Sequence, residues 1–127
     1  MHLYRDVIFP RLLDLMMSQR RLMECRRTAL AEASGDVLEI GFGTGLNLSC
    51  YPAGVSRLTV VDPARHLPAK VEKRMRQVNF PVERAYLDAA RLPFDGGRFE
   101  TVVSTWTLCT IPDVEQALRE VVRVLAP

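Results

Sequence analysis

Cysteine is scarce in this sequence, and no cysteine or histidine pair has the spacing of a metal-binding motif. Cys25, Cys50 and Cys109 lie far apart. Their odd number and wide separation argue against a disulfide framework. We therefore expect reduced thiols, a cytoplasmic location and no metal site.

A strong charge of either sign is also lacking, since the formal net charge is +2 over 127 residues. A surface that binds a nucleic-acid duplex would be expected to be denser in basic residues and more one-sided. We therefore expect no nucleic-acid partner. One local group of basic residues is interpreted as the solvated face of a helix; it comprises Arg65, Lys70, Lys73, Arg74 and Arg76.

Long hydrophobic runs are absent as well. The longest uncharged apolar stretches are far shorter than a bilayer span, and Arg5 and Asp6 precede any apolar run that could resemble a signal peptide. We expect a soluble chain without a transmembrane segment. Its length fits one domain, with an N-terminal helical segment at residues 1–34 and an α/β core at residues 35–127.

Residues 3–33 are predicted to form two helices. Pro10 suits a first helical turn, Ser18 suits the N-cap of the second helix, and Gly35 is expected to end that helix. The pair is amphipathic and mildly basic. Packing on the domain is the favoured interpretation, and a lid or a contact with a lipid surface is the alternative.

Strand-like and helix-like segments then alternate. Strands are predicted at residues 36–40, 57–62, 82–88 and 99–105. A short helix is expected after the first strand, and another runs to about Val78. This alternation predicts a Rossmann-like, doubly wound parallel α/β sheet.

A last helix is predicted to begin at Pro112 and Asp113. Its apolar residues recur at helical spacing and should form one stripe. These residues are Val114, Leu118, Val121, Val122 and Leu125.

A glycine-rich loop, "GFGTG", follows the first strand at residues 41–45. In open α/β sheets, backbone N–H groups of such a loop and the positive end of the next helix meet a ligand at the carboxyl edge. Asp62 comes twenty-one residues after Gly41 and ends the second strand, where it can accept hydrogen bonds from both hydroxyls of a ribose. The glycine loop and Asp62 together favour a nucleoside-containing ligand over a simple phosphate.

The spacing of the glycines separates the candidate ligands. A dinucleotide site has the pattern G-x-G-x-x-G, whereas here the third glycine position holds Leu46. A P-loop is excluded because no Gly-Lys-Ser/Thr follows. Asp88, a second acid, ends the predicted third strand and could accept a hydrogen bond from an adenine amino group. A dinucleotide-dependent oxidoreductase therefore stays the less favoured alternative.

These motifs resemble the class I S-adenosylmethionine-dependent methyltransferases. "VLEIGFGTG" is similar to their first motif, "VVDP" to the second, and residues 87–127 to their third-strand to fourth-helix region. The last segment is close to ubiquinone and menaquinone biosynthesis methyltransferases. "GFGTGLNLSCYPAGVSRLTVVDP" and "STWTLCTIPD" are also similar to the membrane-associated, methyltransferase-like thiol methyltransferases.

The resemblance implies S-adenosyl-L-methionine as the cofactor, with S-adenosyl-L-homocysteine as the product. Gly41, Gly43 and Gly45 would wrap the methionine part, and Glu39 would help to hold this loop or the cofactor's amino group. Asp62 would bind the ribose.

Further site residues follow from the same resemblance. Pro63 belongs to the second motif, and Asp88 with Ala89 would read the adenine. Thr105 and Trp106 would wall the pocket after the fourth strand.

Two further expectations concern Tyr4 and the chemistry. Tyr4 could reach back to cover the cofactor, although a tyrosine packed in the core is the favoured interpretation. No residue stands out as a catalytic base. The resemblance implies methyl transfer to a small or lipophilic acceptor, and the alternative is a non-catalytic module that binds the cofactor or is completed by a partner.

The resemblance also implies a sheet of seven strands in the order 3-2-1-4-5-7-6, of which this sequence supplies the first four, in the order 3-2-1-4. The fourth strand would then be an exposed, apolar edge. We expect a shortened chain that assembles as a homodimer and so covers this edge. A separate completing chain is the alternative.

Overall fold

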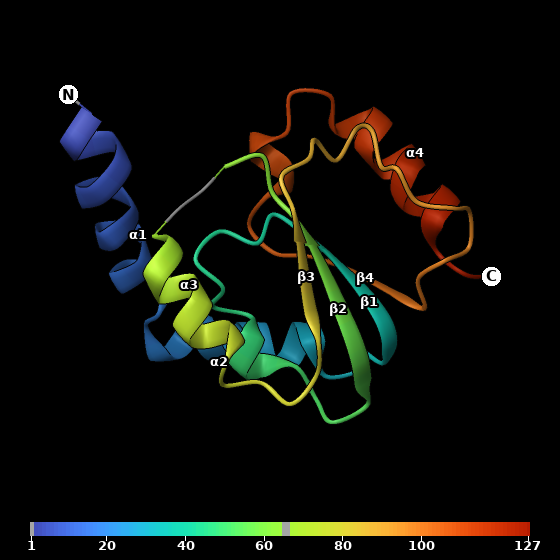
Figure 1. Cartoon of the computed structure of the whole chain (residues 1–127), viewed down its shortest axis with the longest axis horizontal. Coiled ribbons are helices and arrows are strands. Elements are labelled where there is room, and N and C mark those ends of the chain that lie inside the picture. Colours follow the sequence, from blue (N-terminus) through green and yellow to red (C-terminus); the bar gives the residue numbers. More distant parts are fainter. Residues whose placement is uncertain (1, 65–66) are drawn as a thin grey trace.

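A computed structural model describes residues 2–64 and 67–127 of the chain. Its centre is a four-stranded parallel sheet in the order β3-β2-β1-β4 (Figure 1). The strands are β1 (Gly35–Ile40), β2 (Val55–Val61), β3 (Val82–Ala85) and β4 (Thr101–Ser104). The predicted fold class and strand order are confirmed.

The central strands are buried on both faces, which explains their nearly continuous apolar sequences. In β1, Val37 pairs with Leu58 of β2 on one side and with Thr101 of β4 on the other. Val37 and the next residue, Leu38, are both fully buried but belong to different hydrophobic clusters. Successive side chains of a strand point to opposite faces, so each face of the sheet has its own core.

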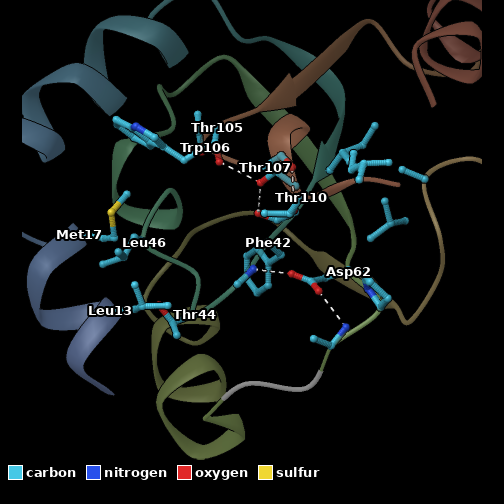
Figure 2. Close-up of a pocket in the computed structure, with 18 of the residues that line it drawn as sticks. Leu13, Met17, Phe42, Thr44, Leu46, Asp62, Thr105, Trp106, Thr107 and Thr110 are labelled. Carbon is cyan, nitrogen blue, oxygen red and sulfur yellow. Dashed lines mark hydrogen bonds between the residues drawn. The ribbon is translucent and has the colours of Figure 1, made fainter. Parts of the chain in front are cut away.

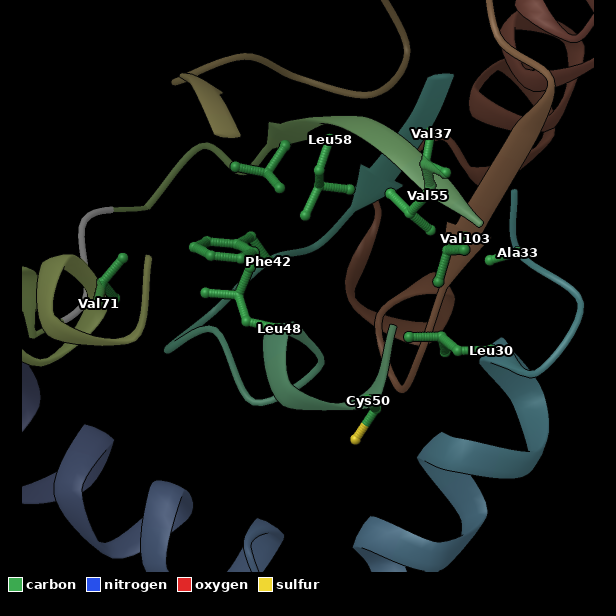
Figure 3. Packing of buried hydrophobic residues seen from close by; sticks show 11 residues of the cluster. Leu30, Ala33, Val37, Phe42, Leu48, Cys50, Val55, Leu58, Val71 and Val103 are labelled. Atoms are coloured by element: carbon green, nitrogen blue, oxygen red, sulfur yellow. The ribbon is translucent and has the colours of Figure 1, made fainter. Parts of the chain in front are cut away.

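Helices from different parts of the chain cover these two faces. One cluster joins the sheet to Leu30 of α2 (Arg20–Leu30) and Val71 of α3 (Pro68–Met75) (Figure 3). The other joins it to Ala117 and Val124 of α4 (Val114–Val124). The sheet is therefore the middle layer of three.

The N-terminal segment begins with the π-helix η1 (Tyr4–Ile8), which continues into α1 (Phe9–Met17). α1 lies at one end of the molecule beside α3 (Figure 1). Short 3-10 turns, η2 (Leu48–Cys50) and η3 (Leu108–Thr110), follow the glycine loop and β4. η2, a single 3-10 turn, stands where a short helix was predicted after the first strand.

The two N-terminal helices match the prediction except at their junction and end. Pro10 lies in the first turn of α1, as predicted. Ser18 is not the N-cap of α2, because Gln19 holds that position and the Ser18 hydroxyl donates to the carbonyl of Leu15 (3.0 Å). Gly35 does not end α2 either, since it opens β1 with a φ of 70°.

The basic residues around α3 are only partly a solvated face. Lys73 and Arg76 are exposed, as expected. Lys70 and Arg74 instead form ion pairs with Asp14 of α1, which sequence patterns on one helix cannot reveal. Arg65, the remaining member, lies outside the described residues.

The residues of the predicted apolar stripe on α4 lie largely outside the core. Asp113 does cap this helix, because its carboxylate accepts a hydrogen bond from the Gln116 N–H (3.1 Å). However, the small Ala117 and Val124 are the residues that α4 buries, whereas Leu118 is 45% and Val122 75% exposed. The rest of the expected stripe is half-buried or exposed; it consists of Val114, Val121 and Leu125.

Candidate functional site

A cavity of about 640 Å³ lies at the carboxyl ends of β1, β2 and β4. Its wall is made by the glycine loop, the segments that follow β2 and β3, the turn after β4, and one face of α1. The predicted loop and acids therefore meet where open α/β sheets bind ligands.

The glycine loop needs its glycines for different reasons. Gly41 has a φ of +81°, and a Cβ there would lie 2.0 Å from the Thr107 hydroxyl oxygen, so the loop passes directly against the turn after β4. Gly43 has a φ of +56° and a Cβ there would meet nothing within 4 Å. Both line the cavity, and the open space at Gly43 lets a ligand approach the backbone closely. Gly45 is not in the cavity wall, because it packs against Phe42 and Leu48.

The two acids that follow β2 and β3 both line the cavity. Asp62 accepts hydrogen bonds from the backbone amides of Gly43 and Ala64, each at 2.8 Å (Figure 2). Asp88 lies three residues beyond the end of β3 and accepts from the amide of Ala90 at 2.9 Å. Backbone donors thus orient both carboxylates and leave lone pairs for ligand hydroxyl or amino groups.

The remaining cavity-wall predictions fall on three segments. Pro63 and Ala89 line the cavity next to the two acids. Thr105 and Trp106 form its wall after β4, as Figure 2 shows. Trp106 has a φ of +51°, which is rare for a large side chain, and its ring lies 4.6 Å from the Arg26 guanidinium.

Glu39 does not line the cavity and is 1% exposed beneath the loop. Its two oxygens accept hydrogen bonds from Asn47 (2.8 Å) and from the Tyr51 hydroxyl (2.7 Å). Burial raises the pKa of Glu39 to about 7, and the hydrogen bonds and the charge of Arg26 offset this only in part. These contacts indicate that Glu39 supports the loop and does not contact a ligand directly.

Buried polar contacts connect Glu39 to the turn after β4. Arg26 of α2 donates to Asn47 (2.8 Å) and to the Thr105 hydroxyl (3.2 Å), and Asn47 also donates to Thr105 (2.9 Å). Arg26 is 7% exposed, and burial lowers its pKa. Helix α2, the loop and the turn after β4 are therefore joined in one network.

The structure does not bring Tyr4 to the cavity. Tyr4 lies in η1, is 57% exposed and has its ring 6.3 Å from that of Phe9. It therefore belongs neither to the cavity wall nor to the core, so the core-packing interpretation is wrong.

No residue of α1 was predicted to line the cavity, although a lid was one alternative for the N-terminal helices. Phe9, Leu13 and Met17 line the cavity, and Asp14 lies among them at 4% exposure. The available signal was a single acid inside the apolar run "LLDLMM", because a buried charge requires a partner.

The two ends of the cavity differ in chemistry. Leu13, Met17 and Leu46 lie on the same side as Trp106, whereas Asp62 lies on the opposite side (Figure 2). The polar end fits an adenosyl group, because carboxylates and loop amides converge where Gly43 leaves the backbone open. The apolar end fits an uncharged, hydrophobic group.

The described part of the cavity wall contains few of the side chains that usually act as nucleophiles, bases or metal ligands. Of the cavity-lining residues within 2–64 and 67–127, none is His, Cys, Lys or Tyr. The same ranges contain no cluster of acidic, His and Cys side chains that could hold a metal ion. In this part of the chain, no helix is both long and apolar enough to cross a membrane.

Comparison with known proteins agrees with this geometry. Residues 38–127 match the model of a methyltransferase domain family. The chain is 34% identical over 103 residues to a phosphatidylethanolamine N-methyltransferase of Cereibacter sphaeroides, covering 78% of this chain and 50% of that protein. It is also 34% identical over 128 residues to the thiol S-methyltransferase TMT1B of Homo sapiens, covering 95% of this chain and 51% of that protein.

A solved structure shows the same fold. The N-methyltransferase NodS from Bradyrhizobium japonicum WM9, in complex with S-adenosyl-L-homocysteine, superposes with a TM-score of 0.69 at 22% identity, covering 87% of this chain and 58% of that one. The chain thus spans about half the length of the curated relatives described above. Fold and sequence show that the chain belongs to the class I methyltransferases, whose cofactor is S-adenosylmethionine.

Proposed function

We propose that this chain forms the cofactor-binding part of an enzyme that transfers a methyl group from S-adenosylmethionine to a small or lipophilic acceptor. The observation that supports this most is the division of the cavity, with Asp62 and Asp88 at one end and the apolar side chains of α1, Leu46 and Trp106 at the other. One ligand with an adenosyl group and one apolar acceptor would fill the two ends.

The proposed cofactor contacts follow from where each group lies. Asp62 would accept hydrogen bonds from the ribose hydroxyls and Asp88, beside Ala89, from the adenine amino group. The backbone of Gly41 and Gly43 would surround the methionine part. Gly45 and Glu39 would act indirectly, by shaping and supporting the loop.

Methyl transfer from this cofactor would need little help from a general base. When bound, S-adenosylmethionine supplies a methyl group on a positively charged sulfur. The residues of this chain would align the acceptor with that methyl group and exclude water, which are the effects on which such a site depends. Thr105 and Trp106 would hold the acceptor in place at their end of the cavity.

The nature of the acceptor follows from the wall that α1 and Trp106 provide. Relatives are named for a thiol and for phosphatidylethanolamine. A thiol ionises readily and would need little help from a general base, and the wall beside α1 and Trp106 is largely apolar. We therefore propose an apolar thiol as the preferred acceptor class.

Two surfaces support proposals about partners. Within the described sheet β4 pairs only with β1, and Leu118 and Val122 of α4 are exposed, which supports a homodimer that covers the β4 edge. Leu12 and Leu15 of α1 are exposed on a helix that also carries an arginine, which supports peripheral contact with a lipid surface. A cytoplasmic location remains part of the proposal.

Ligand binding can be followed through Trp106, because it is the single tryptophan of the chain and lines the cavity. Titration with S-adenosylmethionine, S-adenosylhomocysteine and NAD should change its fluorescence for the two sulfur compounds and not for NAD. Binding of NAD alone would contradict the proposal and favour an oxidoreductase.

Turnover requires a second measurement. A panel of thiols, phenols and quinols with increasing apolar size should be methylated, with thiols ahead, as detected by mass spectrometry. Binding of both sulfur compounds without methylation of any acceptor would favour a non-catalytic module.

A further inference from the structure

Asp14 is the single carboxylate of α1, and it is 4% exposed on the face that lines the cavity. Its Oδ1 accepts hydrogen bonds from the Thr44 hydroxyl (2.5 Å) and from Arg74 Nη1 (2.7 Å). Its Oδ2 accepts from Arg74 Nη2 (3.2 Å) and from Lys70 Nζ. One side chain thus joins α1, the glycine loop and α3.

The loop is held at Thr44 from two directions. Besides the bond of its hydroxyl to Asp14, its backbone carbonyl accepts a hydrogen bond from Arg74 Nη1 (2.7 Å). On the other side of the loop, the preceding Gly43 donates its amide to Asp62. Glycines on both sides of Thr44 would let the loop adopt many shapes, and these contacts select one of them.

The ion pair keeps its charge throughout the range in which proteins are usually stable. Burial raises the pKa of Asp14, but hydrogen bonds from Arg74, Lys70 and Thr44 outweigh burial and hold this pKa well below its usual range. Two cations from α3 therefore face one ionised carboxylate that α1 brings to the loop. Withdrawal of α1 would leave Arg74 and Thr44 without this acceptor.

We propose that Asp14 is a positioning residue that couples the docking of α1 over the cavity to the ligand-binding shape of the glycine loop. Phe9, Leu13 and Met17 reach the cavity on the same helix face. A ligand that contacts the loop therefore binds with α1 docked, and by thermodynamic reciprocity it stabilises the docked helix. The ligand for this inference is the cofactor of the proposed function, on which the inference rests.

A different result is expected if the ion pairs of Asp14 serve stability alone. They would contribute to stability, yet the affinity for ligand and the effect of ligand on α1 would not depend on them. The test must therefore measure both quantities in the full chain.

The test uses S-adenosylhomocysteine with the wild type and Asp14→Ala. In the wild type, the ligand should slow amide hydrogen exchange in residues 9–17. In Asp14→Ala, affinity by calorimetry should fall by about tenfold, within the usual range of coupling between sites. The ligand should also no longer protect residues 9–17, while exchange in β1 stays as in the wild type.

Glu24→Ala provides a matched control, because it removes an acid whose ion pair with Arg20 is exposed on the neighbouring helix. It should keep both affinity and protection. The inference is overturned if folded Asp14→Ala binds within about twofold of the wild type and still shows ligand-dependent protection, since coupling of this kind usually exceeds that factor.

A milder variant covers the case in which Asp14→Ala does not fold. Thr44→Val removes the hydroxyl that contacts Asp14 but leaves both ion pairs in place. We expect weaker binding and less protection of residues 9–17, with a smaller loss of stability than in Asp14→Ala; unchanged binding and protection would overturn the inference. If the wild type itself does not bind S-adenosylhomocysteine, the proposed function fails instead.

Discussion

The backbone amide of Gly43 donates a 2.8 Å hydrogen bond to the carboxylate of Asp62. An acid at the end of β2 thereby fixes the conformation of the loop that follows β1. Asp62 consequently has two tasks in the proposed site: it shapes the loop around the methionine part and offers its remaining lone pairs to the ribose.

Replacing Asp62 with alanine should therefore weaken binding of S-adenosylhomocysteine. Loss of a charged hydrogen bond costs roughly 1.5–3 kcal/mol, which is about a tenfold to 150-fold rise in Kd. Isothermal titration calorimetry measures this directly. Glu83→Ala, at an exposed position on β3, should bind as the wild type does. An unchanged Kd for Asp62→Ala would place the ribose elsewhere.

Alanine at Gly41 and at Gly43 should affect different properties. A residue with a Cβ in the left-handed backbone conformation lowers stability by roughly 1–2 kcal/mol. Both variants should lose this amount. At Gly41 the new Cβ would also meet Thr107, so urea denaturation should show the larger loss of stability there. At Gly43 the Cβ would point into open space, so the larger effect should be on ligand affinity. Equal losses in both assays would contradict this assignment.

Stability should depend on pH through Glu39. Its pKa is about 7 in the folded chain against an ordinary value of 4.5. Between these two values the folded state holds a proton that the unfolded state has lost. The free energy of unfolding therefore falls as pH rises through this window, by on the order of 3 kcal/mol.

Glu39→Gln should remove this dependence, because a neutral amide does not titrate. Urea denaturation between pH 4.5 and 8 should give a flatter profile than that of the wild type, with the largest gain in stability above pH 7. Glu72→Gln, at an exposed position on α3, serves as the control and should follow the wild type. Superimposable wild-type and Glu39→Gln profiles would show that Glu39 is ionised in the folded state.

The proposed dimer can be tested on α4. Val122 is 75% exposed, so Val122→Glu should leave the stability of the monomer unchanged while it opposes burial in an interface. Analytical ultracentrifugation should show a dimer for the wild type and a monomer for this variant. Lys73→Glu, on a helix that covers the opposite face of the sheet, should remain dimeric. A monomeric wild type would rule the dimer out.

Sequence patterns predicted the elements that depend on local order along the chain. Alternating strands and helices indicated the parallel sheet, and the spacing of Gly41, Gly43 and Asp62 placed three groups at one sheet edge. The side of α4 that packs inward could not be predicted in the same way. Leu118 and Val122 have the right period, but the face of α4 that packs inward carries Ala117 and Val124 instead.

Contacts between distant segments also escaped prediction. Asp14 and Arg74 lie sixty residues apart, and nothing in the local pattern of either helix indicates the other. Glu39 was correctly placed beside the loop, but its burial beneath it depends on Asn47 and Tyr51 as hydrogen-bond donors. Local sequence can assign an acid to a strand end without telling which way its side chain points.

The origin of the apolar wall in α1 has a consequence for how members of this family can diverge. The matched methyltransferase domain begins at residue 38, whereas Phe9, Leu13 and Met17 precede it. The α1 part of the proposed acceptor wall therefore lies outside the segment that carries the proposed nucleoside contacts, whereas Leu46 and Trp106 lie within it. Exchange of the N-terminal helix between two members would offer a route to a new acceptor, provided that the incoming helix keeps an acid at the position of Asp14 to hold the glycine loop.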